Sequence, residues 1–137
     1  MKFINKQLAF KLKEKGFDKP CFGFYITDGF EISPEPNCAY YLGHNYKDYL
    51  KKSDFPNTID APTIEQVLEW LREEKDIDIV IYPIDRNTIY MGGEKYILSI
   101  YCCGKRDYKI HKDNNDKFVK WEDACIAGIE YIVEHLI

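Results

Sequence analysis

The sequence lacks the short motifs that mark common nucleotide and cofactor sites. Its one pair of adjacent glycines, Gly92-Gly93, is not followed by the Lys-Ser or Lys-Thr of a phosphate-binding loop. No GxGxxG, HExxH or GxSxG occurs. Asp113, Asn115 and Asp116 lie close together, but the glycine and terminal glutamate of an EF-hand calcium loop are missing. These absences predict that the chain has no cofactor and favour a protein that is not an enzyme.

Histidine is scarce, and the cysteines lack paired spacing. The chain has 3 histidines and 5 cysteines, without a CxxC motif. Cys21, Cys38, His44 and His111 offer the donors that zinc prefers, but their spacing is wrong for a structural site, so we expect no metal. The odd cysteine count fits reduced thiols in a cytoplasmic protein. An enzyme that uses a Cys–His pair stays open as an alternative function.

The chain also lacks an excess of positive charge and a long apolar run. Its net charge is −4, which argues against a general electrostatic grip on nucleic acid or anionic lipid. The lysines among the first twenty residues are typical of a solvated helix face. No segment is apolar for the roughly 18 residues that a membrane span needs, and no secretory signal is visible. We therefore expect a cytoplasmic protein that does not enter a membrane.

What the chain does have is three amphipathic patterns of helical period. From Ile64 to Leu71, apolar residues repeat at i, i+3, i+4 and i+7, which predicts a helix. Pro62 fits the first turn of this helix, because its missing N–H would need no partner there. The same spacing predicts helices over residues 4–15 and 120–136.

Two glycines carry specific expectations for the first and last of these helices. Gly16 lies where a helix over residues 4–15 ends, and Phe17 is then placed to close a Schellman cap against Leu12. Gly128 lies inside the last helix, where glycine costs about 1 kcal/mol relative to alanine. We expect a close approach of the helix backbone to a sheet at Gly128 to offset this cost.

The strand signals are short and separated by turn residues. Asp28-Gly29 predicts a tight hairpin between residues 21–26 and 30–32. Pro83 should confine the strand predicted at residues 77–82 to an edge of the sheet or end it, because proline cannot donate to a central ladder. The predicted strands beyond the hairpin cover residues 77–82, 96–103 and 107–111, and the tract from Ser33 to Asp60 adds an edge strand at 39–42 and a short helix at 45–50. This order predicts a single α+β domain over residues 1–137, an antiparallel sheet of about 4–5 strands with three main helices mostly on one face.

Several phrases resemble a group of small uncharacterised proteins that recur in bacterial phages and prophages. The likeness is carried by Ala61-Pro62-Thr63 followed by Trp70-Leu71-Arg72-Glu73, and by Glu122-Asp123-Ala124 followed by Ala127-Gly128-Ile129 in the last predicted helix. The phrases around Gly16-Phe17, Pro20 to Gly23, Asp78 to Ile81 and Tyr96 are similar as well. The group carries no assigned reaction, so the resemblance implies no catalytic residue.

Aromatic residues are the remaining positive feature. The tract from Ser33 to Asp60 combines four tyrosines with several lysines, and tyrosine offers a large contact area at little cost in entropy. Such a tract suits a protein partner, although aromatics with lysines also suit single-stranded nucleic acid, and packing onto the sheet is a third interpretation. Trp70 is either a packing aromatic or a recognition anchor. The interaction candidates are therefore Tyr40, Tyr41, Tyr46, Tyr49 and Trp70.

These observations lead to one main functional hypothesis. We expect a small, non-enzymatic, cytoplasmic protein of phage or prophage type that binds another macromolecule, with a protein as the partner. No residue is assigned a catalytic or metal-binding role. The alternatives are an enzyme with a Cys–His pair and a single-stranded nucleic-acid binder.

Overall fold

The computed structural model describes residues 2–27, 40–41, 57–83, 96–102 and 117–137. These residues form three helices and two small antiparallel sheets, so the α+β class is confirmed. The chain divides into two compact units, Met1–Gln66 and Val67–Ile137, and each is described by itself. The boundary falls inside a helix, and the expectation of one domain over residues 1–137 stays a prediction.

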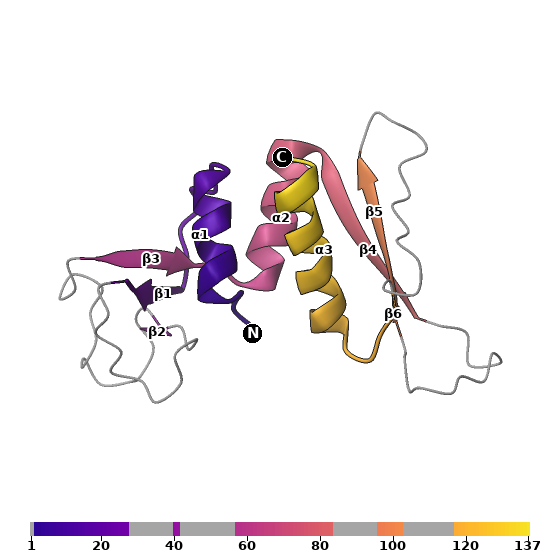
Figure 1. The fold of residues 1–137 in the computed structure, drawn as a ribbon, viewed down its shortest axis with the longest axis horizontal. Coiled ribbons are helices and arrows are strands. Elements are labelled where there is room, and N and C mark those ends of the chain that lie inside the picture. The colour runs from indigo at the N-terminus through magenta and orange to yellow at the C-terminus, as the bar shows by residue number, and fades with distance from the viewer. Residues whose placement is uncertain (1, 28–39, 42–56, 84–95, 103–116) are drawn as a thin grey trace. The chain divides into compact units, whose positions relative to one another are not determined.

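The described residues of the first unit form one complete helix and a three-stranded sheet. The sheet has the order β2-β1-β3, and both pairings are antiparallel, with Phe24 of β1 opposite Tyr40 on one side and Asp60 on the other. The helix contacts β3 (Figure 1). The elements of this unit are α1 (Lys6–Glu14), β1 (Gly23–Ile26), β2 (Tyr40–Tyr41) and β3 (Thr58–Ala61).

Both ends of α1 are fixed by local chemistry. At its start the side-chain oxygen of Asn5 accepts a hydrogen bond from the Leu8 N–H at 2.8 Å, which satisfies one of the unpaired donors of the first turn. At its end Gly16 has a φ of +94°, and the Phe17 N–H donates to the Leu12 carbonyl at 3.0 Å. The Schellman cap expected at Gly16 is therefore confirmed.

A helix that begins in the first unit, α2 (Ile64–Lys75), starts two residues after Pro62. Its N-cap is Thr63, whose hydroxyl accepts from the Gln66 N–H at 3.3 Å, while the Gln66 side-chain oxygen accepts from the Thr63 N–H at 3.0 Å. This reciprocal pair is a capping box. The placement of Pro62 in the first turn was wrong, because the threonine side chain sets the start of the helix one residue after itself.

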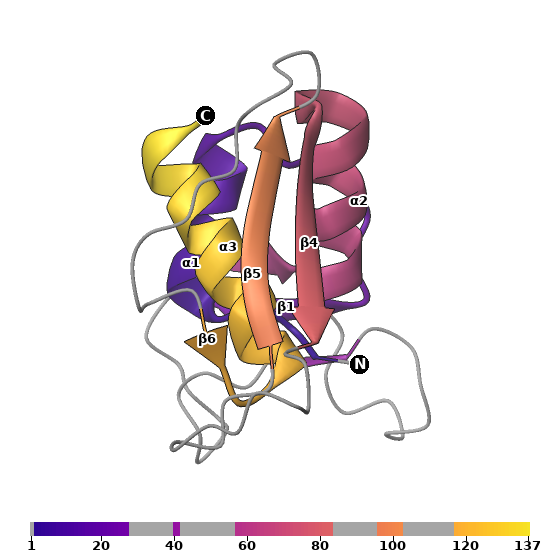
Figure 2. The ribbon, with the colours of Figure 1, turned by 90° about the vertical axis from the view of Figure 1, so that its right-hand side faces the viewer.

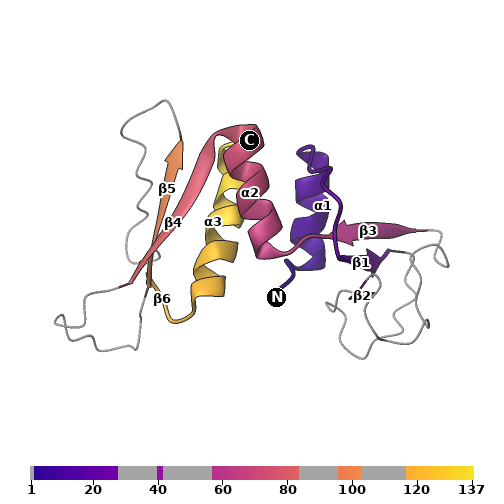
Figure 3. The same cartoon turned by 180° about the vertical axis from the view of Figure 1, so that it is seen from behind.

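The second unit contains a sheet with longer strands and the last helix. Its elements are the continuation of α2 with β4 (Ile77–Pro83), β5 (Tyr96–Cys102), β6 (Lys117–Phe118) and α3 (Trp121–His135). The order is β4-β5-β6, again antiparallel, so β4 lies at an edge of the sheet and ends at Pro83 as predicted. Within this unit α3 covers one face of the β4–β5 pair (Figures 2 and 3).

Gly128 lies where α3 crosses the sheet. An ideal Cβ on Gly128 would stand 3.0 Å from the Cδ1 atoms of both Ile79 and Leu98. Contacts this short are tighter than ordinary van der Waals packing. The expected close approach is confirmed, and it is made to side chains of β4 and β5.

The sheet prediction needs a correction. The described strands form two separate three-stranded sheets, in place of a single sheet of about 4–5 strands covered by three helices. Side-chain alternation identifies a strand but not its partner, and β6 has only two residues, too few to show an alternation. The second arm of the predicted hairpin, the helix at 45–50 and the strand at 107–111 lie outside the described residues.

Candidate functional site

The tyrosine candidates are only partly described. Tyr40 and Tyr41 form β2, the short strand at one edge of the first sheet, which confirms the predicted edge strand at these two positions. Tyr46 and Tyr49 lie outside the described residues. Two of the four tyrosines therefore have a known backbone position, at the end of the strand order β2-β1-β3.

Trp70 lies in the interior. Its side chain is 2% exposed, and the Lys75 ammonium lies 5.3 Å from the ring centroid, within the range of a cation–π contact. A side chain so deeply buried has almost no surface to offer a partner. This burial favours the packing interpretation of Trp70 over the recognition one.

The thiols and the imidazole of the described residues are dispersed. Cys125 is fully buried, whereas Cys21 and Cys102 are half-buried, and all three are free of disulfide bonds. His135 ends α3, with its ring 4.6 Å from that of Tyr131. Among the described residues no group of three His, Cys, Asp or Glu side chains could hold a metal ion. Cys38, His44, Cys103 and His111 lie outside this part of the chain.

The sheet of the second unit has two chemically different faces. Paired residues of antiparallel strands share a face, and the register pairs Ile79 with Ile100 and Ile81 with Leu98 on the face that meets α3. The opposite face carries the alternate residues: Asp78, Val80 and Tyr82 from β4, and Ile97, Ser99 and Tyr101 from β5.

Two tyrosines on this second face contact each other through their hydroxyls. The two hydroxyl oxygens of Tyr82 and Tyr101 are 3.1 Å apart. Tyr82 is paired with Ile97, which lies four residues from Tyr101 along β5. The Cα atoms of Tyr82 and Tyr101 are therefore offset by about 14 Å along the strand direction, at about 3.4 Å per residue. Each ring must therefore lean along the sheet toward the other. The hydroxyls meet above the Val80–Ser99 pair, which lies halfway between them in the register.

The hydroxyl contact shifts the pKa of Tyr82. The hydrogen bond with Tyr101, followed by desolvation, raises the pKa of Tyr82 above its ordinary value of 10.0. Deprotonation of Tyr82 is therefore less favourable than that of a free tyrosine, which argues against Tyr82 as an activated phenolate. Ser99 is fully buried, and its hydroxyl has no hydrogen-bond partner among the described residues.

Tyr82 and Tyr101 are not among the site candidates predicted from the sequence. The alternation of residues in both strands predicts that Tyr82 and Tyr101 each face the same side as their i−2 neighbours, but the contact depends on the register between β4 and β5. Other large apolar side chains also stand in solvent: Phe10 at 43%, Phe22 at 54% and Val119 at 52% exposure. Single exposed apolar residues are normal on protein surfaces, so they define no site by themselves.

No protein-family model, curated protein or solved structure shows a significant match to this chain. Among the described helices, none combines the length and the apolar character needed to cross a membrane.

Proposed function

We propose that this protein is a non-enzymatic, cytoplasmic protein of phage or prophage type that acts by binding another protein. The observation that carries the proposal is the position of Tyr40 and Tyr41 on β2 at the edge of the first sheet. Edge strands present unpaired backbone groups to partners, and tyrosine is enriched where proteins meet.

The test begins with the identity of the partner. The tagged full chain is cross-linked in infected or lysogenic cells, and the recovered proteins are identified by mass spectrometry. The partner is then purified, and its affinity is compared for the wild-type chain and a variant in which Tyr40, Tyr41, Tyr46 and Tyr49 are all replaced by alanine. We expect the fourfold variant to bind the partner more weakly than the wild type by about 2 kcal/mol or more, the size of an interface hot spot. The free energy of unfolding should change by about 0.5 kcal/mol or less per surface position.

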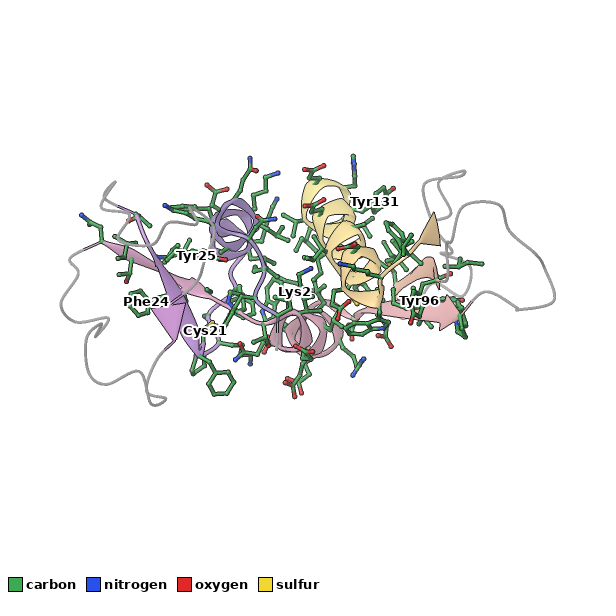
Figure 4. The ribbon with its side chains drawn as sticks, turned by 90° about the horizontal axis from the view of Figure 1, so that it is seen from below. Lys2, Cys21, Phe24, Tyr25, Tyr96 and Tyr131 are labelled. Atoms are coloured by element: carbon green, nitrogen blue, oxygen red, sulfur yellow. The ribbon has the colours of Figure 1, made fainter. Side chains whose placement is uncertain are left out.

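The test has one matched control and three results that would count against the proposal. Tyr131→Ala, on α3, removes a half-buried tyrosine of the other unit and should leave the affinity unchanged (Figure 4). Unfolding of the fourfold variant would show that the tyrosines pack the fold and would remove the support for the proposal. Steep salt dependence of binding to single-stranded nucleic acid, or a thiol that reacts well below its usual pKa of about 8.5, would favour one of the alternatives.

A further inference from the structure

We propose that Tyr82 and Tyr101 form an oxidative cross-linking site, at which a one-electron oxidant couples the two rings into a dityrosine bridge between β4 and β5. The proposal rests on the contact between the two hydroxyls, 3.1 Å apart, and on the exposure of Tyr82. It is independent of the binding function proposed above.

The chemistry needs an oxidant of the peroxidase type with hydrogen peroxide as the electron acceptor. Each phenol loses one electron and one proton and becomes a neutral phenoxyl radical, whose unpaired electron is shared with the ring carbons next to the C–O carbon. A carbon–carbon bond then forms between one such carbon of each ring, and the two displaced ring protons restore the two phenols. In total, two phenols and one hydrogen peroxide give the bridged pair and two water molecules.

The geometry favours coupling within the pair. The reactive ring carbons are neighbours of the carbons that bear the hydroxyls, so a hydroxyl contact brings them close to one another. Rotation of the exposed Tyr82 side chain can complete the approach. Because adjacent strands hold both side chains, coupling is intramolecular and avoids the entropy cost of an encounter between two chains.

Among the described residues beside the hydroxyl contact, few side chains would compete for the radicals. Val80 and Ser99, the pair below the hydroxyl contact, are not readily oxidised. Cys102 follows Tyr101 directly, but consecutive residues of a strand point to opposite faces, so its thiol lies on the other side of the sheet. Asp78, the partner of Tyr101 in the register, forms an ion pair with Arg72 at 3.1 Å.

The test treats the purified full chain with a haem peroxidase and hydrogen peroxide at low protein concentration. We expect dityrosine fluorescence in the monomer fraction, and a protease digest in which the peptides containing Tyr82 and Tyr101 are joined and lack two hydrogen atoms. Tyr82→Phe and Tyr101→Phe keep the rings and remove one hydroxyl each, so both should abolish this linked peptide.

Tyr96→Phe is the matched control, because Tyr96 lies on β5 but on the opposite face from Tyr101. It should leave the yield of the linked peptide unchanged. The wild-type chain oxidised in denaturant is a second control that needs no variant to fold, and its yield of this peptide should fall several-fold. Absence of the linked peptide from the folded wild-type chain, or an equal yield in denaturant, would overturn the proposal.

Discussion

Both units bury an apolar core, but the contacts that join their distant segments differ in kind. In the first, hydrogen bonds join segments that are far apart in the sequence: the Tyr25 hydroxyl donates to the Ile4 carbonyl, and the Gln66 amide donates to the Pro20 carbonyl at 2.8 Å. Tyr25 lies on the side of β1 that faces α1 (Figure 4). In the second, α3 packs directly on the sheet at Gly128, and the contacts are apolar.

This difference has an energetic meaning. Buried apolar side chains contribute most of the stability of a fold, whereas a single hydrogen bond contributes a net of about 0.5–1.5 kcal/mol. Substitutions in the apolar core of the second unit should therefore cost more than the loss of one hydrogen bond in the first. The predictions below test this ranking.

The largest effect is expected at Trp70, in the second unit. Trp70→Ala should lower the free energy of unfolding by about 3–5 kcal/mol, because it removes a large side chain that is 2% exposed and leaves a cavity. Equilibrium unfolding in urea measures the change. Trp121→Ala is the matched control, since Trp121 is only half-buried and should cost less. A loss below about 1 kcal/mol at Trp70 would contradict its assignment to the core.

The second prediction concerns the tight contact at Gly128. Gly128→Leu should cost about 1–3 kcal/mol through overpacking against Ile79 and Leu98, even though leucine is the better helix former. Gly128→Ala should cost less, because the atoms that its Cβ meets are ends of flexible side chains and alanine gains about 1 kcal/mol of helix propensity. A melting temperature of Gly128→Leu equal to or above that of the wild type would break the packing argument.

The features that the sequence could predict are those with a local physical cause. The strands at β4 and β5 and the edge position set by Pro83 follow from residues next to one another in the chain. So does the cap at Gly16, because the Schellman geometry joins residues within one turn. The close approach at Gly128 was predicted from the cost of a glycine inside a helix, although its partners, Ile79 and Leu98, could not be named. Local rules suffice where the physical cause is local.

Other features depend on register or on contacts between distant segments. The pairing of β1 with β3 joins Phe24 to Asp60 across more than thirty residues, and no alternation in either strand names that partner. The Tyr82–Tyr101 contact needs the register of β4 on β5 before it can be foreseen. The capping box was different, because Thr63 and Gln66 have the Thr-x-x-Gln spacing that the sequence already displays. Among the candidate site residues that the structure describes, the edge position of Tyr40 and Tyr41 was predicted, and for Trp70 the burial favours the packing interpretation over the recognition one.

The third prediction tests a polar contact of the first unit. Tyr25→Phe removes the hydroxyl that donates to the Ile4 carbonyl and keeps the buried ring, so it should cost about 1–2 kcal/mol for the carbonyl left without a partner. Hydrogen exchange should show faster exchange at the amides of β1 and β3 than in the wild type, with those of β4 and β5 less affected. A loss of stability in Tyr25→Phe larger than that in Gly128→Leu would contradict the expectation that core substitutions cost more than the loss of one hydrogen bond.

The smallest effect is expected at the exposed tyrosine pair. The hydrogen bond with Tyr101 raises the pKa of Tyr82 in the folded state, so the contribution to stability is fully present below the unfolded-state pKa of about 10 and is lost as the pH rises through the folded-state pKa. NMR titration of ring-labelled tyrosine resolves the Tyr82 signal. In Tyr101→Phe the pKa of Tyr82 should move down toward its ordinary value, while Tyr131→Phe, a substitution away from the pair, should leave it raised. An unchanged titration of Tyr82 in Tyr101→Phe would show that the hydroxyl contact is not formed in solution, and would also remove the geometric basis of the proposed cross-link.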